Sequence, residues 1–201
     1  MEGTVDVLCS GIGTLTNPTN IANTVSEKVS GNTVRAYIGY LTDAFLFSEA
    51  KRYDVKGREY LRFPVKYYCE DIGLRNARLG FRQMESSHIM ENILYNELVN
   101  RGFNVDVGVV TVDETDPSGD TVRKRKEVDF VVNKGNAYAY IQSAFSIPDE
   151  KKMTQEKSSL NHIRSSFPKI IVRMDTFGRW YDDDGHLHIN LLDFLLDKNS
   201  V

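Results

Sequence analysis

Glu127-Val128-Asp129-Phe130-Val131-Val132 is the stretch of this 201-residue chain that decides the fold. It predicts an apolar β-strand that carries a carboxylate near its start. The polar residues 133–136 include a glycine and predict a tight turn, because glycine adopts the backbone angles that such turns require. Residues 138–144, Tyr-Ala-Tyr-Ile-Gln-Ser-Ala, predict a second apolar strand. The three segments together predict a β-hairpin.

This hairpin has the layout of a metal-dependent nuclease core, in which one acid lies on the first strand and an acid and a lysine lie on the second. The acids hold Mg²⁺, and the lysine stabilises negative charge near the attacking water. Asp129 lies where the first acid is needed, but Gln142 and Ala144 lie where the second acid and the lysine are needed. The pattern therefore predicts a phosphodiesterase scaffold that lacks the second acid and the lysine of the catalytic site.

The overall composition is that of a globular protein, with 41% hydrophobic and 26% charged residues. The formal net charge of −3 gives no general attraction to nucleic acid or to an anionic membrane, so DNA binding would need a local basic face. No apolar run approaches the ~20 residues of a membrane span, and the N-terminus lacks the layout of a signal peptide. Cys9 and Cys69 match no metal or redox spacing and predict core or surface thiols in a reducing compartment. A cytoplasmic location is therefore expected.

Residues 1–63 predict a winged-helix domain, which consists of helices followed by a β-hairpin. Asn17-Pro18 predicts a helix start, because asparagine is a good cap and proline fits the first helical position. Apolar residues recur at helical spacing over 31–44, and a hairpin is expected over 45–63. Residues 5–9 predict the end of a helix whose beginning is missing, so the domain is expected to be truncated at its N-terminus.

Residues 64–201 predict a second domain with a mixed sheet flanked by helices, so the fold class is expected to be α/β. Residues 71–73 are predicted to be a polar break near its start. The elements expected around the central hairpin are a helix at 83–101, a strand at 103–109, a long polar hairpin loop at 113–126, a helix from 148 to 162, a strand at 169–174, a hairpin tip at 182–185 and a helix at 191–196.

Four stretches in this order carry a resemblance to a known family: IGTLTNP at 12–18, YYCEDIGLRNA at 67–77, MENILYNEL at 90–98 and EVDF at 127–130. They resemble the C-terminal portion of a group of bacterial and archaeal AAA-type (P-loop) ATPases. In that group, a nucleotide-binding module is followed by a winged helix and by a domain of unknown function with a restriction-endonuclease-like fold. The resemblance implies that ATP and Mg²⁺ belong to the upstream module. The chain has no Gly-x-x-x-x-Gly-Lys-Ser/Thr loop, so we expect no cofactor in this fragment.

The same resemblance assigns positions in the nuclease-like domain. Glu91 corresponds to the helix acid and Asp129 to the first-strand acid, while Gln142 and Ala144 occupy the positions of the second acid and the lysine. Glu127 is a substitute ligand, because it lies two residues before Asp129 on the same face of the strand, about 6.6 Å away.

Gln155, on the following helix, matches a polar position that some members of the family use. In the alternative interpretation, Glu91 and Asp129 are a buried polar pair that holds a helix against the sheet. We expect no nuclease activity, because one charged ligand and the lysine are both missing.

A winged helix that binds DNA needs polar and basic groups on its recognition helix and wing, because phosphate contacts supply most of the affinity. The candidates are Asn32, Thr33 and Arg35 on the helix and Lys56 and Arg58 on the wing. Seven basic residues in 1–63 are balanced by seven acidic ones, so the alternative is a spacer that docks the ATPase module.

Two further clusters of polar residues remain open to interpretation. The basic run 123–126 directly precedes Glu127. It either binds phosphates beside the nuclease position or forms a charged hairpin edge that prevents pairing with strands of other chains. His186 and His188 are expected on one face of a strand, but two ligands without a third predict no metal site.

The sequence thus predicts a non-catalytic, DNA-binding or regulatory region of a P-loop ATPase. Double-stranded DNA and the chain's own ATPase module are the expected partners, and no membrane is expected. Two alternatives stay open: an active Mg²⁺-dependent nuclease that uses Glu91, Asp129 and Glu127, and a protein-interaction scaffold.

Overall fold

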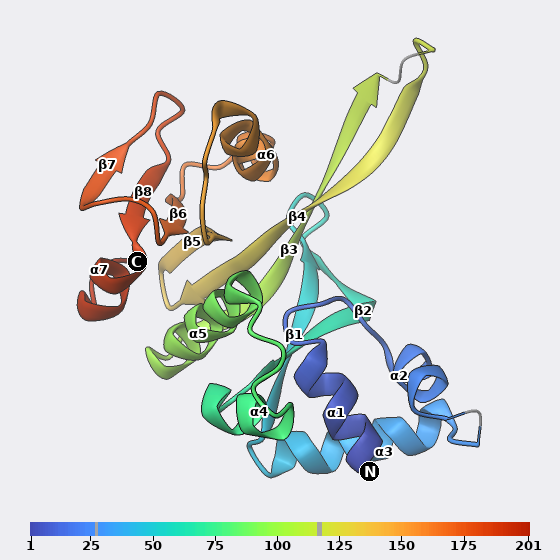
Figure 1. Ribbon diagram of the computed structural model, residues 1–201. Helices are drawn as coiled ribbons and strands as arrows, with labels where there is room; N and C mark the ends of the chain where they lie inside the picture. The colour runs from blue at the N-terminus through green and yellow to red at the C-terminus, as the bar shows by residue number, and fades with distance from the viewer. Residues whose placement is uncertain (27, 116–117) are drawn as a thin grey trace. The chain divides into compact units, whose positions relative to one another are not determined.

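The computed structural model describes residues 1–26, 28–115 and 118–201, which form seven helices and eight strands (Figure 1). The chain divides into two compact units. The first unit comprises Met1–Arg52 and Leu61–Asn96, and the second comprises Tyr53–Tyr60 and Glu97–Val201. The domain boundary predicted between residues 63 and 64 falls inside the strand Glu59–Cys69.

The first unit is built from helices around a β-hairpin. Its elements are α1 (Glu2–Ser10), α2 (Pro18–Val25), α3 (Gly31–Asp43), β1 (Phe47–Asp54), β2 (Glu59–Cys69), α4 (Ile72–Arg78) and α5 (Ser86–Asn100). The tip of the β1–β2 hairpin and the last turn of α5 belong to the second unit. The predicted order of helices followed by a hairpin is therefore present in this part of the chain.

Local capping signals set the helix boundaries in the first unit. The side chain of Asn17 accepts a hydrogen bond from the Asn20 amide (2.9 Å), which confirms the predicted start of α2. The break predicted at residues 71–73 is instead the start of α4, because the Asp71 carboxylate caps the Leu74 amide (2.9 Å). Apolar side chains of α1, α2, α3, β1, β2 and the segment after α1 form the buried core: Leu8, Cys9, Ile12, Ile21, Ala22, Val34, Ile38, Leu41, Phe47, Val65, Tyr67 and Cys69.

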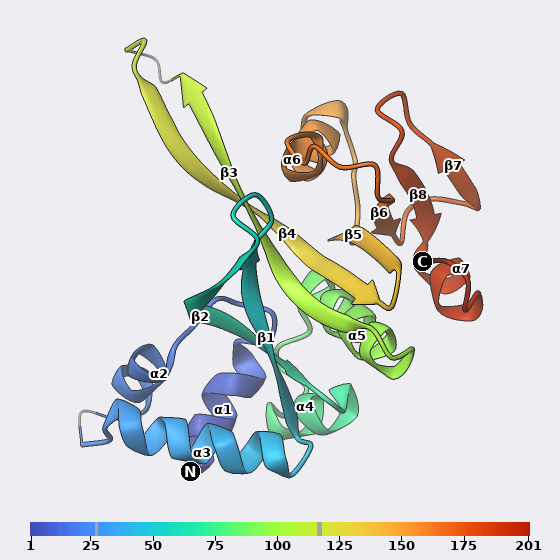
Figure 2. The ribbon, with the colours of Figure 1, turned by 180° about the vertical axis from the view of Figure 1, so that it is seen from behind.

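The second unit contains a mixed sheet with helices packed against it (Figure 2). Its elements are β3 (Asn104–Thr115), β4 (Thr121–Lys134), β5 (Ala137–Ala144), α6 (Glu150–Asn161), β6 (Lys169–Arg173), β7 (Arg179–Tyr181), β8 (Leu187–Asn190) and α7 (Leu191–Leu196). Their hydrogen-bonded order is β3-β4-β5-β6-β8-β7. The pairs β5–β6 and β6–β8 are parallel and the others are antiparallel, so the α/β class predicted from the sequence is confirmed.

The central hairpin of the second unit is the one that the sequence predicts. Phe130 pairs with Ile141 and Lys134 with Ala137, so the turn lies at Gly135 and Asn136. Gly135 has φ +57°, a left-handed conformation that favours glycine. α6 packs against β4 and β5 and connects the parallel strands β5 and β6. β4, β5 and α6 therefore carry the predicted site residues Glu127, Asp129, Gln142 and Gln155.

Most of the polar stretch 113–126 is strand and not the predicted loop, since β3 ends at Thr115 and β4 begins at Thr121. Over this stretch the two strands form a long ribbon in which Asp113 pairs with Arg123 (Figures 1 and 2). The loop tip expected at 117–119 lies partly outside the described residues. Lys124 and Lys126 both bind the Glu114 carboxylate, at 3.0 and 2.6 Å, and they lower the pKa of Glu114 to about 2. Acids of one strand thus face bases of the other, and such cross-strand pairs stabilise a ribbon that has few apolar residues.

No helix in residues 1–26, 28–115 and 118–201 is long and apolar enough to cross a membrane.

Candidate functional site

A cavity of about 680 Å³ lies in the second unit, where α6 packs on β4 and β5. It brings together four of the positions that the sequence analysis singled out: Glu127, Asp129, Gln142 and Gln155. The remaining lining residues are Lys126, Lys151, Thr154, Glu156, Ser158 and Ser159. We refer to this cavity as the carboxylate pocket.

Asp129 is held by the neighbouring strand. Its side chain is on β4 and is 8% exposed, and one carboxylate oxygen accepts a hydrogen bond from the Ser143 amide of β5 (2.8 Å). A backbone amide that binds a carboxylate stabilises its charged form and fixes its orientation. Asp129 therefore ties β4 to β5 at the point where the predicted first acid stands.

Gln142 lies on β5 and binds a carboxylate that the sequence analysis missed. Its Nε2 donates a hydrogen bond to the Glu156 side chain of α6 (3.2 Å), and Glu156 also forms an ion pair with Lys152 (2.5 Å). The spacing of Lys152 and Glu156, one helical turn apart, is the signal that would have placed Glu156 on a defined face of α6. The pocket thus contains a third acid, which is neutralised by a lysine of its own helix.

Ala144 supplies no chemistry to the pocket. It is 4% exposed and packs in the apolar core with Ile147 and Leu160. Lys126, at the other side of the pocket, is bound to Ser158 and to Glu114 (2.6 Å). The position predicted for the lysine is therefore a core position, and this pocket lysine is engaged by protein groups.

The acids of the pocket do not converge on one point. Within the described residues, the group of three acidic or histidine side chains whose ligand atoms lie within 4.8 Å of one another is Asp182, Asp184 and His186. Glu127, Asp129 and Glu156 form no such group. A two-metal or one-metal phosphodiesterase site requires carboxylate oxygens around a shared ion, so these side chains would have to move to create one.

Glu91 lies on α5 in the first unit and has a structural partner there. Its Oε1 is 2.8 Å from Lys66 Nζ and accepts a hydrogen bond from the Tyr68 hydroxyl (2.6 Å). The side chains of Lys66 and Glu91 are only 4% and 11% exposed. Gly13, with φ +69°, lies against the carboxylate, since a Cβ there would come within 3.2 Å of Oε1. Glu91 is thus a member of a buried ion pair between α5 and β2.

The residues predicted to bind DNA are divided between the two units. Asn32 and Arg35 are exposed on α3, and the Arg35 guanidinium is 5.9 Å from the centre of the Phe63 ring. The Thr33 hydroxyl bonds to Ser30, the residue that caps α3 (2.9 Å). The remaining two candidates, Lys56 and Arg58, lie at the tip of the β1–β2 hairpin in the second unit.

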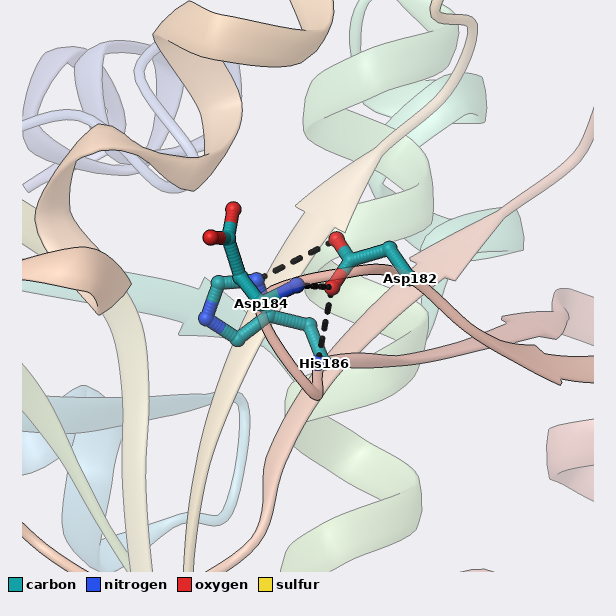
Figure 3. A group of neighbouring side chains, drawn as sticks. All are labelled: Asp182, Asp184 and His186. Atoms are coloured by element: carbon teal, nitrogen blue, oxygen red, sulfur yellow. Dashed lines mark hydrogen bonds and ion pairs between the residues drawn. The ribbon is translucent and has the colours of Figure 1, made fainter.

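A compact cluster of polar residues lies between β7 and β8 in the second unit (Figure 3). One oxygen of Asp182 accepts hydrogen bonds from the amides of Asp184 (3.0 Å) and His186 (2.9 Å). The other oxygen contacts His186 Nδ1 (3.3 Å) and His188 Nε2 (3.1 Å). Both histidines therefore bind the same aspartate. Their spacing in the sequence predicts no metal site.

Lys157 of α6 supplies the positive charge in this cluster. Its ammonium is 3.0 Å from Asp182 Oδ2 and also binds Asp184. Burial opposes the charge of Asp182, but hydrogen bonds from the His186 backbone, His188 and Lys157 hold its pKa well below the usual range. Asp182, Asp184 and His186 are close enough to hold a metal ion, but Lys157 already binds both carboxylates. We interpret the cluster as a structural link between α6 and the β7–β8 hairpin.

This cluster predicts a loss of stability in mild acid. Burial lowers the pKa of His186 and His188 below 6.5, and Asp182 has a pKa below 3.8. The unfolded chain therefore binds protons before the folded chain does, so the free energy of unfolding should fall below about pH 6.5 and again below about pH 4. The urea midpoint of the second unit, followed by Trp180 fluorescence between pH 8 and 3.5, measures this effect.

His88→Ala is the control, because the His88 side chain is 37% exposed and belongs to the first unit. This variant should show the same pH dependence as the unmodified chain. A urea midpoint that stays constant from pH 7 to 5 would contradict the prediction.

Comparison with known proteins gives two similarities. A family model described as a domain of unknown function (DUF8612) matches residues 1–85. An uncharacterized protein of Haemophilus influenzae (strain ATCC 51907 / DSM 11121 / KW20 / Rd) is 35% identical over 202 residues, which cover 98% of this chain and 46% of the relative. The chain thus spans about half the length of the curated relative that it matches. No solved structure matches the chain.

Proposed function

We propose that this chain binds nucleic acid without cleaving it, as the C-terminal region of a P-loop ATPase. The observation that carries the proposal is the carboxylate pocket. It contains the acid of a nuclease core at Asp129, but Gln142 binds Glu156 and Ala144 is buried in the core. In this proposal the second unit has a nuclease-like fold that binds nucleic acid, and the missing second acid and lysine support the absence of phosphodiester hydrolysis.

The first unit supports contact with double-stranded DNA. The elements α1, α2, α3, β1 and β2 follow one another in the order of a winged helix. Val34, Ile38 and Leu41 bury one face of α3, while Asn32 and Arg35 are exposed on it. An exposed helix with polar and basic side chains fits the major groove of DNA. We therefore assign Asn32 and Arg35 to duplex binding in this proposal.

The ATPase context rests on the resemblance of four sequence stretches to AAA-type proteins. The match to only 46% of the length of the Haemophilus influenzae relative leaves room in that relative for a further module. In this proposal, the nucleotide-binding module is the partner of the chain and supplies ATP hydrolysis.

A salt titration of duplex binding tests the proposal. We expect a labelled duplex to bind more weakly as salt rises, and Arg35→Ala to reduce the slope of log K against log salt by about 0.9, the effect of one lost phosphate contact. Arg82→Ala is the control, because Arg82 is an exposed arginine of the same unit that lies between α4 and α5. A slope near zero for the unmodified chain would exclude phosphate binding and favour the protein-interaction scaffold.

A Mg²⁺-dependent nuclease is the second candidate function, because Glu127, Asp129 and Glu156 line one pocket with Lys126 and Lys151. Incubation of the chain with plasmid DNA and Mg²⁺ or Mn²⁺ distinguishes the two functions. We expect no cleavage. Cleavage that Asp129→Ala abolishes and Asp183→Ala leaves intact would establish the nuclease instead.

A further inference from the structure

A second and larger cavity of the second unit, of about 1000 Å³, has a different chemical character. It lies among the tip of the β1–β2 hairpin, β5 and the segment that follows α6. Its lining residues are Tyr53, Val55, Lys56, Arg58, Tyr138, Tyr140, Asn161, His162, Ile163, Arg164, Ser165 and Phe167. All of them belong to the second unit. We call this cavity the basic aromatic cleft.

The charged side chains of the basic aromatic cleft are all basic. Lys56, Arg58 and Arg164 line it, and no aspartate or glutamate is among its lining residues. In the part of the chain that the structure describes, the guanidinium groups of Arg58 and Arg164 make no ion pair or hydrogen bond with protein. Unpaired guanidinium groups at one cavity attract phosphate, which they bind in a bidentate manner.

The hairpin tip holds Arg58 in a defined position. The Asp54 side chain accepts hydrogen bonds from the amides of Lys56 (3.0 Å) and Gly57 (2.9 Å). Arg58 follows with φ +55°, and its own amide donates to the Asp54 carbonyl (2.8 Å). The Asp54 side chain is thus used to close the turn, and the turn places Arg58 at the cleft.

Aromatic rings form the apolar part of the cleft. Tyr138 contacts Tyr140 at 5.4 Å and Phe167 at 4.8 Å between ring centres. Tyr53 and Tyr138 also pack against the apolar core of the second unit, which fixes their positions. Phe167 is 45% exposed, so part of its surface is accessible at the cleft. The cleft therefore offers a ring for stacking next to groups for phosphate.

We propose that the basic aromatic cleft binds single-stranded nucleic acid, with a base stacked on Phe167 and phosphates bound by Arg58 and Arg164. Single strands expose the faces of their bases, whereas a duplex stacks them inside, so exposed aromatic rings beside basic groups select the single-stranded form. This binding is independent of the proposed duplex binding by α3, because the two sites share no residue.

Fluorescence anisotropy with a labelled 20-nucleotide oligo(dT) tests the aromatic part of the proposal. Loss of stacking on one base costs about 1–3 kcal/mol, so Phe167→Ala should weaken the Kd about 5- to 150-fold. Phe177→Ala is the matched control, because Phe177 is 95% exposed and lies outside the cleft. It should bind like the unmodified chain.

The salt dependence tests the basic part of the proposal. Each phosphate contact contributes about 0.7 to the slope of log K against log salt for a single strand, so the double variant Arg58→Ser/Arg164→Ser should lower the slope by about 1.4. Lys198→Ser is the control, because it removes an exposed charge of the same unit outside the cleft. An oligo(U) of the same length shows whether RNA or DNA binds more tightly.

Two results would overturn the proposal. The first is equal affinity of the unmodified chain and the Phe167→Ala and arginine variants for oligo(dT). The second is a duplex of the same length that competes as well as the single strand. Phe167→Leu keeps much of the apolar volume and removes the ring. It replaces Phe167→Ala if circular dichroism shows that the alanine variant is unfolded. Loss of duplex binding in Arg35→Ala with unchanged oligo(dT) binding would show that the two sites are separate.

Discussion

Replacing Asp182 with alanine is expected to lower the free energy of unfolding of the second unit by about 3–5 kcal/mol. The Asp182 side chain is 8% exposed and is one of the two carboxylates that bind Lys157, whose own side chain is 14% exposed. Without Asp182, the amides of Asp184 and His186 and the ring of His188 all lose an acceptor. Buried donors without a partner carry the full cost of desolvation, which makes this loss large.

Trp180 reports directly on this change. It is the only tryptophan of the chain, and its ring stacks on His188 at 4.0 Å and donates to Thr176 (3.0 Å). Urea unfolding followed by its fluorescence measures the stability of the second unit. Asp183→Ala is the matched control, because Asp183 is the exposed neighbour on the same hairpin tip. If both variants unfold at the same urea concentration, the cluster contributes no stability.

Replacing Glu91 with alanine is expected to destabilise the first unit by about 3–5 kcal/mol, because the buried Lys66 ammonium would lose its counter-charge. Tyr68 would also lose the acceptor of its 2.6 Å hydrogen bond. Urea unfolding followed by circular dichroism at 222 nm measures the effect. Glu85→Ala removes an exposed acid just before α5 and should change the midpoint little.

A double variant separates charge burial from packing at this position. Glu91→Leu/Lys66→Met replaces the ion pair with apolar side chains, and such replacements are often neutral or stabilising. We expect it to be more stable than Glu91→Ala. A double variant that is as unstable as Glu91→Ala would mean that the hydrogen bond from Tyr68, and not the lysine, carries the effect.

Elements with strong local signals could be predicted from the sequence. The Asn17 cap marks α2, the 133–136 turn marks the β4–β5 hairpin, and the apolar run 191–196 coincides with α7. The ribbon over 113–126 could not be predicted, because its stability comes from charge pairs between strands and not from apolar alternation. The polar residues 71–73 favour a break by composition alone, whereas the Asp71 carboxylate caps the start of α4.

Some of the predicted site residues lie together in the structure. Glu127, Asp129 and Gln142 do line one pocket, since all three lie on the two paired strands of the predicted hairpin. Glu156 was missed, because only the packing of α6 on β4 and β5 brings it to Gln142. The basic aromatic cleft was missed as well, since Arg58 was assigned to the wing alone.

The sequence by itself determined where most strands and helices lie, because caps, turns and apolar periodicity act over a few neighbouring residues. Only the tertiary structure decided what the polar side chains do. Glu91 pairs with Lys66, Asp182 with Lys157, and Arg58 shares a cleft with Arg164 and Phe167. Each of these partners lies far away in the chain, and the chemistry of a charged group depends on the partners and burial that packing gives it.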